Sequence, residues 1–123
     1  MAKVAPDAVM DAALAYIQAC DLMVLCSAQP SSYTNATTVV DIGDVALTTP
    51  DDLVIADGAS GRKITIAGKN AVPIDHSGTI THIALCKVGD TTLRYITTVT
   101  SAAVTQGETA DVPAFSIQIS DPT

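Results

Sequence analysis

The chain has 123 residues, a length that suits one domain with a substantial core. Six basic residues against thirteen acidic residues give a net charge of −7, so the chain lacks the basic surface that nucleic acids and anionic membranes require. Hydrophobic residues make up 48% of the chain but aromatic residues only 3%, which predicts a core of Ala, Val, Ile and Leu. We therefore expect no nucleic-acid partner and no membrane partner.

The N-terminus is not typical of a secretion signal, because Asp7 and Asp11 interrupt what would be its apolar stretch. No run approaches the roughly 20 apolar residues that cross a bilayer. We therefore expect synthesis and folding in the cytoplasm. Cys20, Cys26 and Cys86 form an odd set without a C-x-x-C spacing, which favours buried free thiols. A single disulfide, within the chain or between subunits, is the alternative.

Residues 6–19 form the one predicted helix. Pro6 suits a first turn, and Asp7 complements the positive end of the helix dipole. Apolar residues recur at helical spacing along it, namely Val9, Met10, Ala13, Leu14, Tyr16 and Ile17. We expect this stripe to cover an open face of the sheet or to contact a neighbouring subunit.

The next segments differ in character. Residues 22–26 are apolar at every position, which favours a strand covered on both faces over continuation of the helix. Ser, Thr, Asn and Asp then dominate residues 31–56, with only short apolar pieces between them. This pattern predicts an extended loop or arm that contacts a neighbouring molecule.

A hairpin over residues 79–99 is the predicted centre of the fold. Gly89 and Asp90 lie between two runs rich in β-branched residues and can take the positive φ angles of a two-residue turn. Both faces carry apolar residues, so the hairpin should lie between two layers. The turn would place Cys86 opposite Leu93, Ala84 opposite Tyr95, and His82 opposite Thr97.

Four further extended pieces are predicted, at 62–67, 71–74, 102–105 and 115–120. With the hairpin and the strand at 22–26 they predict a mainly β fold: an antiparallel β-sandwich, jelly-roll or immunoglobulin-like, with one N-terminal α-helix. We divide this single domain, 1–123, into an N-terminal helix or arm (1–20), a strand (21–30), an extended loop or arm (31–56) and a β-sandwich core (57–123).

The histidines and aspartates do not predict a catalytic or metal site. On one strand, His82 and Cys86 would lie roughly 13 Å apart at about 3.3 Å per residue, too far to share a metal ion or a proton. We expect a half-buried His82 bonded to a threonine or to the backbone. Calcium ligands could come from two acidic groups, for which we prefer turn and capping roles: Asp41 with Asp44, and Asp51 and Asp52 with Asp57. We expect no catalytic residue, no metal and no cofactor, and therefore no enzyme.

Strands rich in Thr, Ala and Val are predicted in three stretches of similar character, at 57–67, 78–85 and 113–119. The middle one has the sequence Gly78-Thr79-Ile80-Thr81-His82-Ile83-Ala84-Leu85. In these stretches the chain resembles small virion proteins of tailed bacteriophages, in particular head decoration or cement proteins. The resemblance implies a non-catalytic structural protein that binds the outside of the phage capsid and stabilises it.

The same resemblance implies synthesis in the host bacterial cytoplasm and a final location on the capsid surface of the virion. The implied partners are the major capsid protein and copies of the chain itself, as a dimer or trimer. We expect the contacts on the helix and on the 31–56 segment, through Val9, Tyr16, Val39, Val40, Ile42, Val45 and Leu47.

Two other functions stay open. A neck, tail or fibre-attachment component of the virion would have the same sequence character and differ in copy number. A carbohydrate- or receptor-binding β-sandwich module is a further alternative, which the scarcity of aromatic residues for stacking on sugars disfavours.

Overall fold

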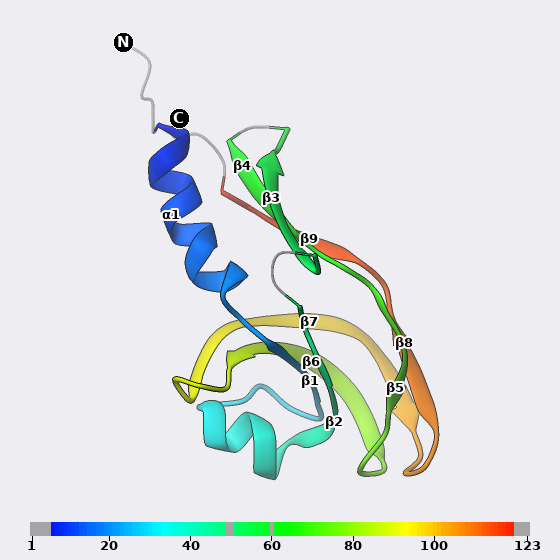
Figure 1. The fold of residues 1–123 in the computed structure, drawn as a ribbon. Helices are drawn as coiled ribbons and strands as arrows, with labels where there is room; N and C mark the ends of the chain where they lie inside the picture. Colours follow the sequence, from blue (N-terminus) through cyan, green and yellow to red (C-terminus); the bar gives the residue numbers. More distant parts are fainter. Residues whose placement is uncertain (1–5, 49–50, 60, 120–123) are drawn as a thin grey trace.

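A computed structural model describes residues 6–48, 51–59 and 61–119, which form a mainly β fold with antiparallel sheets and one N-terminal helix (Figure 1). The predicted fold class is confirmed, and the sheets are arranged like a sandwich around a shared core. The elements in chain order are α1 (Asp7–Gln18), β1 (Leu22–Cys26), the short π-helix η1 (Asn35–Val39), β2 (Asp41–Ala46), β3 (Leu53–Asp57), β4 (Arg62–Ile66), β5 (Lys69–Pro73), β6 (Gly78–Lys87), β7 (Thr92–Val104), β8 (Thr109–Val112) and β9 (Phe115–Ile119).

The described strands form three sheets, with the orders β2-β1-β6-β7, β3-β4-β9 and β5-β8. β1 lies inside the largest sheet and is covered on both faces, as its uniformly apolar sequence predicted. On one face, Met23 and Leu25 belong to the main core. On the other, Val24 and Cys26 pack in a smaller cluster that includes Ala36 of η1. The strand prediction for 22–26 is confirmed over helix continuation.

The two smaller sheets are successive parts of one long ribbon. Ile66 pairs with Phe115, and Lys69 pairs with Val112 three residues further along each strand, so the register is unchanged between them. Figure 1 shows β4 and β5 running beside β9 and β8. Between the two sheets, a Cβ added at Gly68 would lie 2.9 Å from the carbonyl oxygen of Val112. Only glycine lets the two backbones approach so closely there.

The helix α1 lies against β3 and β4, close to its predicted bounds (Figure 1). Its buried side chains are Met10 and Leu14, and Leu14 is fully enclosed in the main core. A hydrophobic face therefore attaches the helix to the sheet, as predicted. Within the described ranges, no helix has the length and apolar character that crossing a membrane requires.

The central hairpin forms, but its turn differs from the prediction. The turn spans four residues, closed by the Thr91 amide donating to the Val88 oxygen at 3.0 Å, and the positive φ of 48° is at Thr91 rather than at Gly89 or Asp90. Cys86 and Leu93 pair as predicted. Beyond them Arg94 is an extra residue, because Leu85 already pairs with Tyr95.

This β-bulge at Arg94 makes the other predicted pairs wrong by one residue. Ala84 pairs with Ile96 instead of Tyr95, and His82 pairs with Thr98 instead of Thr97. The prediction that the hairpin lies between two apolar layers is confirmed, since Leu85 belongs to the main core and Ala84 to the smaller cluster.

The segment 31–56 is not an extended arm, and that prediction is wrong. η1 and the strands β2 and β3 lie within it: β2 pairs with β1, and β3 pairs with β4. Both strands lie at an edge of their sheet, where few positions need to be apolar, so the sequence pattern was weak. β8 was also missed, and the piece predicted at 102–105 is largely the end of β7.

Candidate functional site

Helix α1 has three stripes along its surface. One is buried against the sheet and includes Met10 and Leu14. A second carries polar side chains, and a third is apolar and exposed. The polar stripe comprises Asp7, Asp11 and Gln18, and the exposed apolar stripe comprises Val9, Ala12, Ala13 and Tyr16.

The exposed apolar stripe has the spacing i, i+3, i+4, i+7, the pattern of a helix face that packs against another surface. Val9 is 61% exposed and Tyr16 is 53% exposed. Within the described ranges, Val9, Ala12 and Ala13 are exposed, and Tyr16 is covered in part by Arg94 of β7. A helix that packs only against its own sheet would be expected to carry polar residues at these positions. α1 therefore has a second apolar face, which is not the face that it buries against the sheet.

Contacts of the polar stripe fix the rotation of α1 about its axis. The Nε of Arg62 on β4 donates to Asp11 Oδ1 at 2.8 Å. The side-chain amide of Gln18 donates to the carbonyl oxygen of Leu53 on β3 at 3.0 Å. Because the sheet holds this stripe at Asp11 and at Gln18, the stripe that carries Val9 is directed away from it.

Tyr16 is held in place by Arg94. The guanidinium carbon lies 3.9 Å from the centre of the tyrosine ring, a cation–π contact. The same guanidinium donates to the carbonyl oxygen of Tyr16 at 2.8 Å and to Asp90 Oδ2 at 2.8 Å. One face of the exposed ring is thus already occupied, and its position is fixed before any partner binds.

The other predicted contact residues differ in how exposed they are. Val39 on η1 (cyan in Figure 1) is 72% exposed. Val40 and Val45 are half-buried and pack at the margins of the two clusters. Ile42 and Leu47 are 2% and 5% exposed and belong to the main core, so they are not available as anchors for a partner. Their assignment to an arm was wrong because the segment forms part of the large sheet.

Two exposed apolar residues were missed by the sequence analysis. Val54 on β3 is 50% exposed, and Val88 in the hairpin turn is 45% exposed. Val54 follows the buried Leu53, and this alternation in an edge strand is the signal that could have located it.

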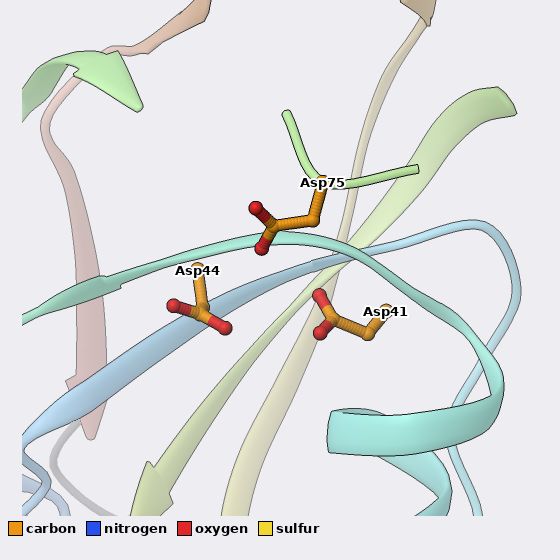
Figure 2. Close-up of side chains that lie close together, drawn as sticks. All are labelled: Asp41, Asp44 and Asp75. Atoms are coloured by element: carbon orange, nitrogen blue, oxygen red, sulfur yellow. The ribbon is translucent and has the colours of Figure 1, made fainter. Parts of the chain in front are cut away.

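A second candidate feature is a group of three carboxyl groups. Asp41 and Asp44 on β2 and Asp75 after β5 each have a carboxylate oxygen within 4.8 Å of the others (Figure 2). Backbone hydrogen bonds bring Asp75 close to Asp41 and Asp44, because the amides of Asp75 and His76 donate to the carbonyl oxygen of Ile42 at 2.7 and 3.1 Å. The sequence analysis paired Asp41 with Asp44 but missed Asp75, which only the packing of β5 beside β2 brings near.

Electrostatics in this group disfavour full ionisation. Burial, with the charges of Asp44 and Asp75 acting in the same direction, raises the pKa of Asp41 to about 6, and only His76 opposes the shift. Burial also raises the pKa of Asp44. Asp41 Oδ1 is buried and has no hydrogen-bond partner among the described residues. Carboxylate oxygens so arranged could hold a proton or a hard cation such as Ca²⁺.

Two of the other acidic residues that the sequence analysis considered for calcium, Asp52 and Asp57, lie elsewhere in pairs with basic residues. Asp52 binds Lys69 with an Oδ2–Nζ distance of 2.8 Å. Asp57 Oδ1 lies 2.7 Å from Arg62 Nη1. Asp52 Oδ2 also accepts a hydrogen bond from the Thr48 amide at 2.7 Å, which is a turn role of the kind that the sequence analysis preferred.

The histidine and cysteine predictions agree with the structure. His82 Nδ1 lies 2.8 Å from Thr81 Oγ1, as expected for a half-buried histidine bonded to a threonine. Cys20, Cys26 and Cys86 are free and buried. Burial raises the pKa of these thiols to about 11, about 12 and about 11 respectively, so they are protonated at neutral pH and poor nucleophiles.

Comparisons with models of protein families, with curated proteins and with solved structures found no match for this chain. Similarity therefore assigns neither a family nor a function. The functional argument rests on the exposed apolar stripe of α1 and on the cluster of three carboxyl groups.

Proposed function

We propose that the protein is a non-catalytic structural component of a phage virion, which binds the outside of the capsid and stabilises it. The observation that carries the proposal is the exposed apolar stripe of α1. Val9 and Tyr16 are more than half exposed on a chain whose net charge is −7, and an uncharged face of this kind is typical of a surface that is covered in an assembly.

The rest of the fold supports this role. Both faces of β1 are buried, and α1 is fixed to the sheet by Arg62 and by Leu14. A rigid core that presents a fixed helix can hold two neighbours at a set distance. The resemblance of the strands to phage decoration and cement proteins gives the class of assembly. The proposed partners are the major capsid protein and further copies of the chain, as a dimer or trimer on the capsid surface.

Two alternatives remain as proposals of lower rank. A neck, tail or fibre-attachment component would use the same surface at low copy number. A carbohydrate- or receptor-binding module would need an aromatic ring free for stacking. Tyr16 is the most exposed candidate, and Arg94 already covers one face of its ring.

Quantitative mass spectrometry of purified particles tests the proposal. We expect one copy of this chain per shell protein, or a simple fraction set by the symmetry axes of the capsid. A few copies per particle would support the neck or tail alternative instead. Absence from particles would refute a virion function and favour the binding module.

The same measurement on variants tests the surface. Val9→Lys places a charge in the exposed apolar stripe without disturbing the buried stripe, and we expect its copy number to fall about tenfold or more. Ala103→Lys adds the same charge at an exposed position near the far end of β7, away from α1, and should leave the copy number unchanged. Equal incorporation of both variants would show that α1 is not the docking element.

A further inference from the structure

We infer that the groove between β7 and the strands β8 and β9 binds an extended segment of a partner protein, uncharged or basic, which adds a strand to the free edge of β7. The inference goes beyond the proposed function and does not rest on it, because the groove shares no residue with the exposed apolar stripe of α1. Free strand edges, an apolar floor and a single charged side chain together specify this occupant.

The edges that border the groove differ from the other sheet edges of the described residues. β2, at one edge of the largest sheet, lies beside β5, and the Asp75 amide donates to the carbonyl oxygen of Ile42 at 2.7 Å. At the edge strand β3, the Gln18 side chain of α1 donates to the carbonyl oxygen of Leu53.

β7, β8 and β9 have no such cover at their outer edges. Each is the last strand of its sheet, and within the described ranges none of the three pairs with another, although β7 leads into β8 through the turn at 105–108 (Figure 1). A free edge presents a row of backbone N–H and C=O groups, and a further strand is the element that pairs them in register. The backbone therefore favours an extended segment as the occupant.

The groove between these edges reaches the core. Two adjoining hollows of about 400 and 170 Å³ form it, and both are lined by Ile83, Val99 and Val112. Leu25 and Ile80, which belong to the main core, line the larger hollow. An apolar side chain of a bound strand would therefore pack against the core of the protein, as side chains on one face of a strand do in a closed sandwich.

The free edge of β7 carries little protection against pairing. Edge strands are usually protected by charged residues or proline. From Arg94 onward, β7 has neither as far as its end at Val104. Its register with β6 shifts at Arg94 and again between Thr98 and Ala102, and between these two bulges residues 95–98 pair regularly with β6. We therefore place the added strand beside residues 95–98.

The opposite wall determines the charge of the segment. Asp111 is the one charged residue among those that line the two hollows. Its carboxylate accepts a hydrogen bond from the Ala71 amide at 2.9 Å, and it forms no ion pair with a described basic side chain. Charge complementarity favours a segment with Lys or Arg near Asp111 and without acidic residues. The net charge of −7 makes a second copy of this chain a poorer occupant.

The wall that carries Asp111 does not supply the paired edge. Pro113 lies between β8 and β9 and lines both hollows. Proline has no N–H to donate, so a ladder of hydrogen bonds along this wall would be interrupted there. The backbone of the segment therefore pairs with β7, and its side chains contact β8 and β9.

Selection from a peptide library tests the inference without a known partner. Random peptides of about ten residues, displayed on messenger RNA, are selected against the full-length protein. The same library is selected against Ala102→Trp, in which a large side chain occupies the groove. Ala102 and Ala103 are both exposed, but only Ala102 lines the groove, so Ala103→Trp is the matched control. We expect enriched peptides with apolar residues at alternate positions, a basic residue and no acidic residue.

Fluorescence anisotropy then measures the affinity of the enriched peptides. We expect Ala102→Trp to weaken binding about tenfold or more, and Ala103→Trp to change it less than about twofold. Asp111→Asn keeps the oxygen that accepts from the Ala71 amide but removes the charge, and should weaken binding of the basic peptides about threefold. Circular dichroism checks folding. If Ala102→Trp does not fold, Thr100→Trp makes the same change at another exposed position that lines the groove.

Hydrogen exchange distinguishes strand addition from insertion of a side chain alone. With peptide bound, we expect slower exchange of those amides in residues 95–98 that do not bond to β6. Unchanged exchange there would overturn the inference, because the peptide would bind without pairing to β7. Enrichment that is equal for the wild type and Ala102→Trp would overturn it as well, and so would enriched peptides that are acidic.

This test is separate from the test of the proposed function. The selection needs no virus particle, so a chain that binds peptides in the groove but is absent from particles retains this inference and loses the virion function. Conversely, a chain that is present in particles at the expected ratio but enriches no peptide retains the virion function and loses the strand-binding groove.

Discussion

A carboxylate oxygen that is buried without a hydrogen-bond partner makes stability depend on pH, and Asp41 has such an atom, Oδ1, within the part of the chain that the structure describes. Its pKa is raised to about 6 from an ordinary value of 3.8, chiefly by burial. The folded state therefore binds a proton more tightly than the unfolded state does. This stabilisation is complete below about pH 4 and is lost as the pH rises through about 6. A cation bound by Asp41, Asp44 and Asp75 would reduce the repulsion between their carboxylate groups.

Replacing Asp41 by asparagine removes this dependence. A pKa raised from 3.8 to about 6 corresponds to a change in the free energy of unfolding of at most about 3 kcal/mol, and solvent screening of the partly exposed side chain lowers this to about 1 kcal/mol. We expect the free energy of unfolding of the wild type to decrease between pH 5 and pH 7, and that of Asp41→Asn to decrease less. Urea denaturation at several pH values measures both, with Asp51→Asn as the control for an exposed carboxyl group. Parallel curves for wild type and Asp41→Asn would contradict the prediction.

At the scale of the elements, the ribbon β4–β5 with β8–β9 depends on close backbone approach. Gly68 is the point where its two halves join, and an added Cβ would meet the Val112 carbonyl oxygen at 2.9 Å and the Ala114 nitrogen at 3.0 Å. Both atoms belong to the backbone, so the clash can be relieved only by a shift of the strand. The two sheets that share this ribbon carry β3 and part of the main core, including Val72 and Ile66.

We therefore expect Gly68→Ala to lower the free energy of unfolding by about 1–3 kcal/mol, the typical cost of forced overpacking. The matched control is Gly89→Ala in the hairpin turn, where an added Cβ meets only the end of the Lys87 side chain at 4.0 Å and should change stability little. Urea denaturation compares the two variants. Equal stability of both would show that the ribbon adjusts at its junction without strain.

At the scale of the whole molecule, net charge opposes every contact between copies. Charge repulsion between chains of −7 decreases as ionic strength rises, because the screening length shortens from about 30 Å at 0.01 M salt to about 10 Å at 0.1 M. Apolar contacts between copies would not weaken under these conditions.

Association between copies of the chain, which the proposed dimer or trimer requires, should therefore increase with salt. We expect a larger oligomeric fraction at 0.1 M than at 0.01 M sodium chloride. Copies held together by opposite charges would show the reverse, because salt weakens attraction between ions. Analytical ultracentrifugation at both salt concentrations measures the fraction.

Some parts of the candidate site were predictable from local pattern. The helical repeat every 3.6 residues placed Val9 and Tyr16 in one apolar stripe with Leu14, and only the structure divides that stripe into a buried face and an exposed face. The error at Ile42 and Leu47 has a different origin. Short apolar pieces between polar residues fit both an arm and an edge strand, and only pairing of β2 with β1 decides between them.

The sequence by itself determined the mainly β class, helix α1, and the strands at 22–26 and 62–66, because periodicity and turn residues act over a few neighbouring positions. Only the tertiary structure decided the bulge at Arg94, the shared register of the ribbon, and the meeting of Asp75 with Asp41. These depend on which distant strands lie side by side. Strand pairing is set by packing across the whole core, and no local pattern of side chains encodes it.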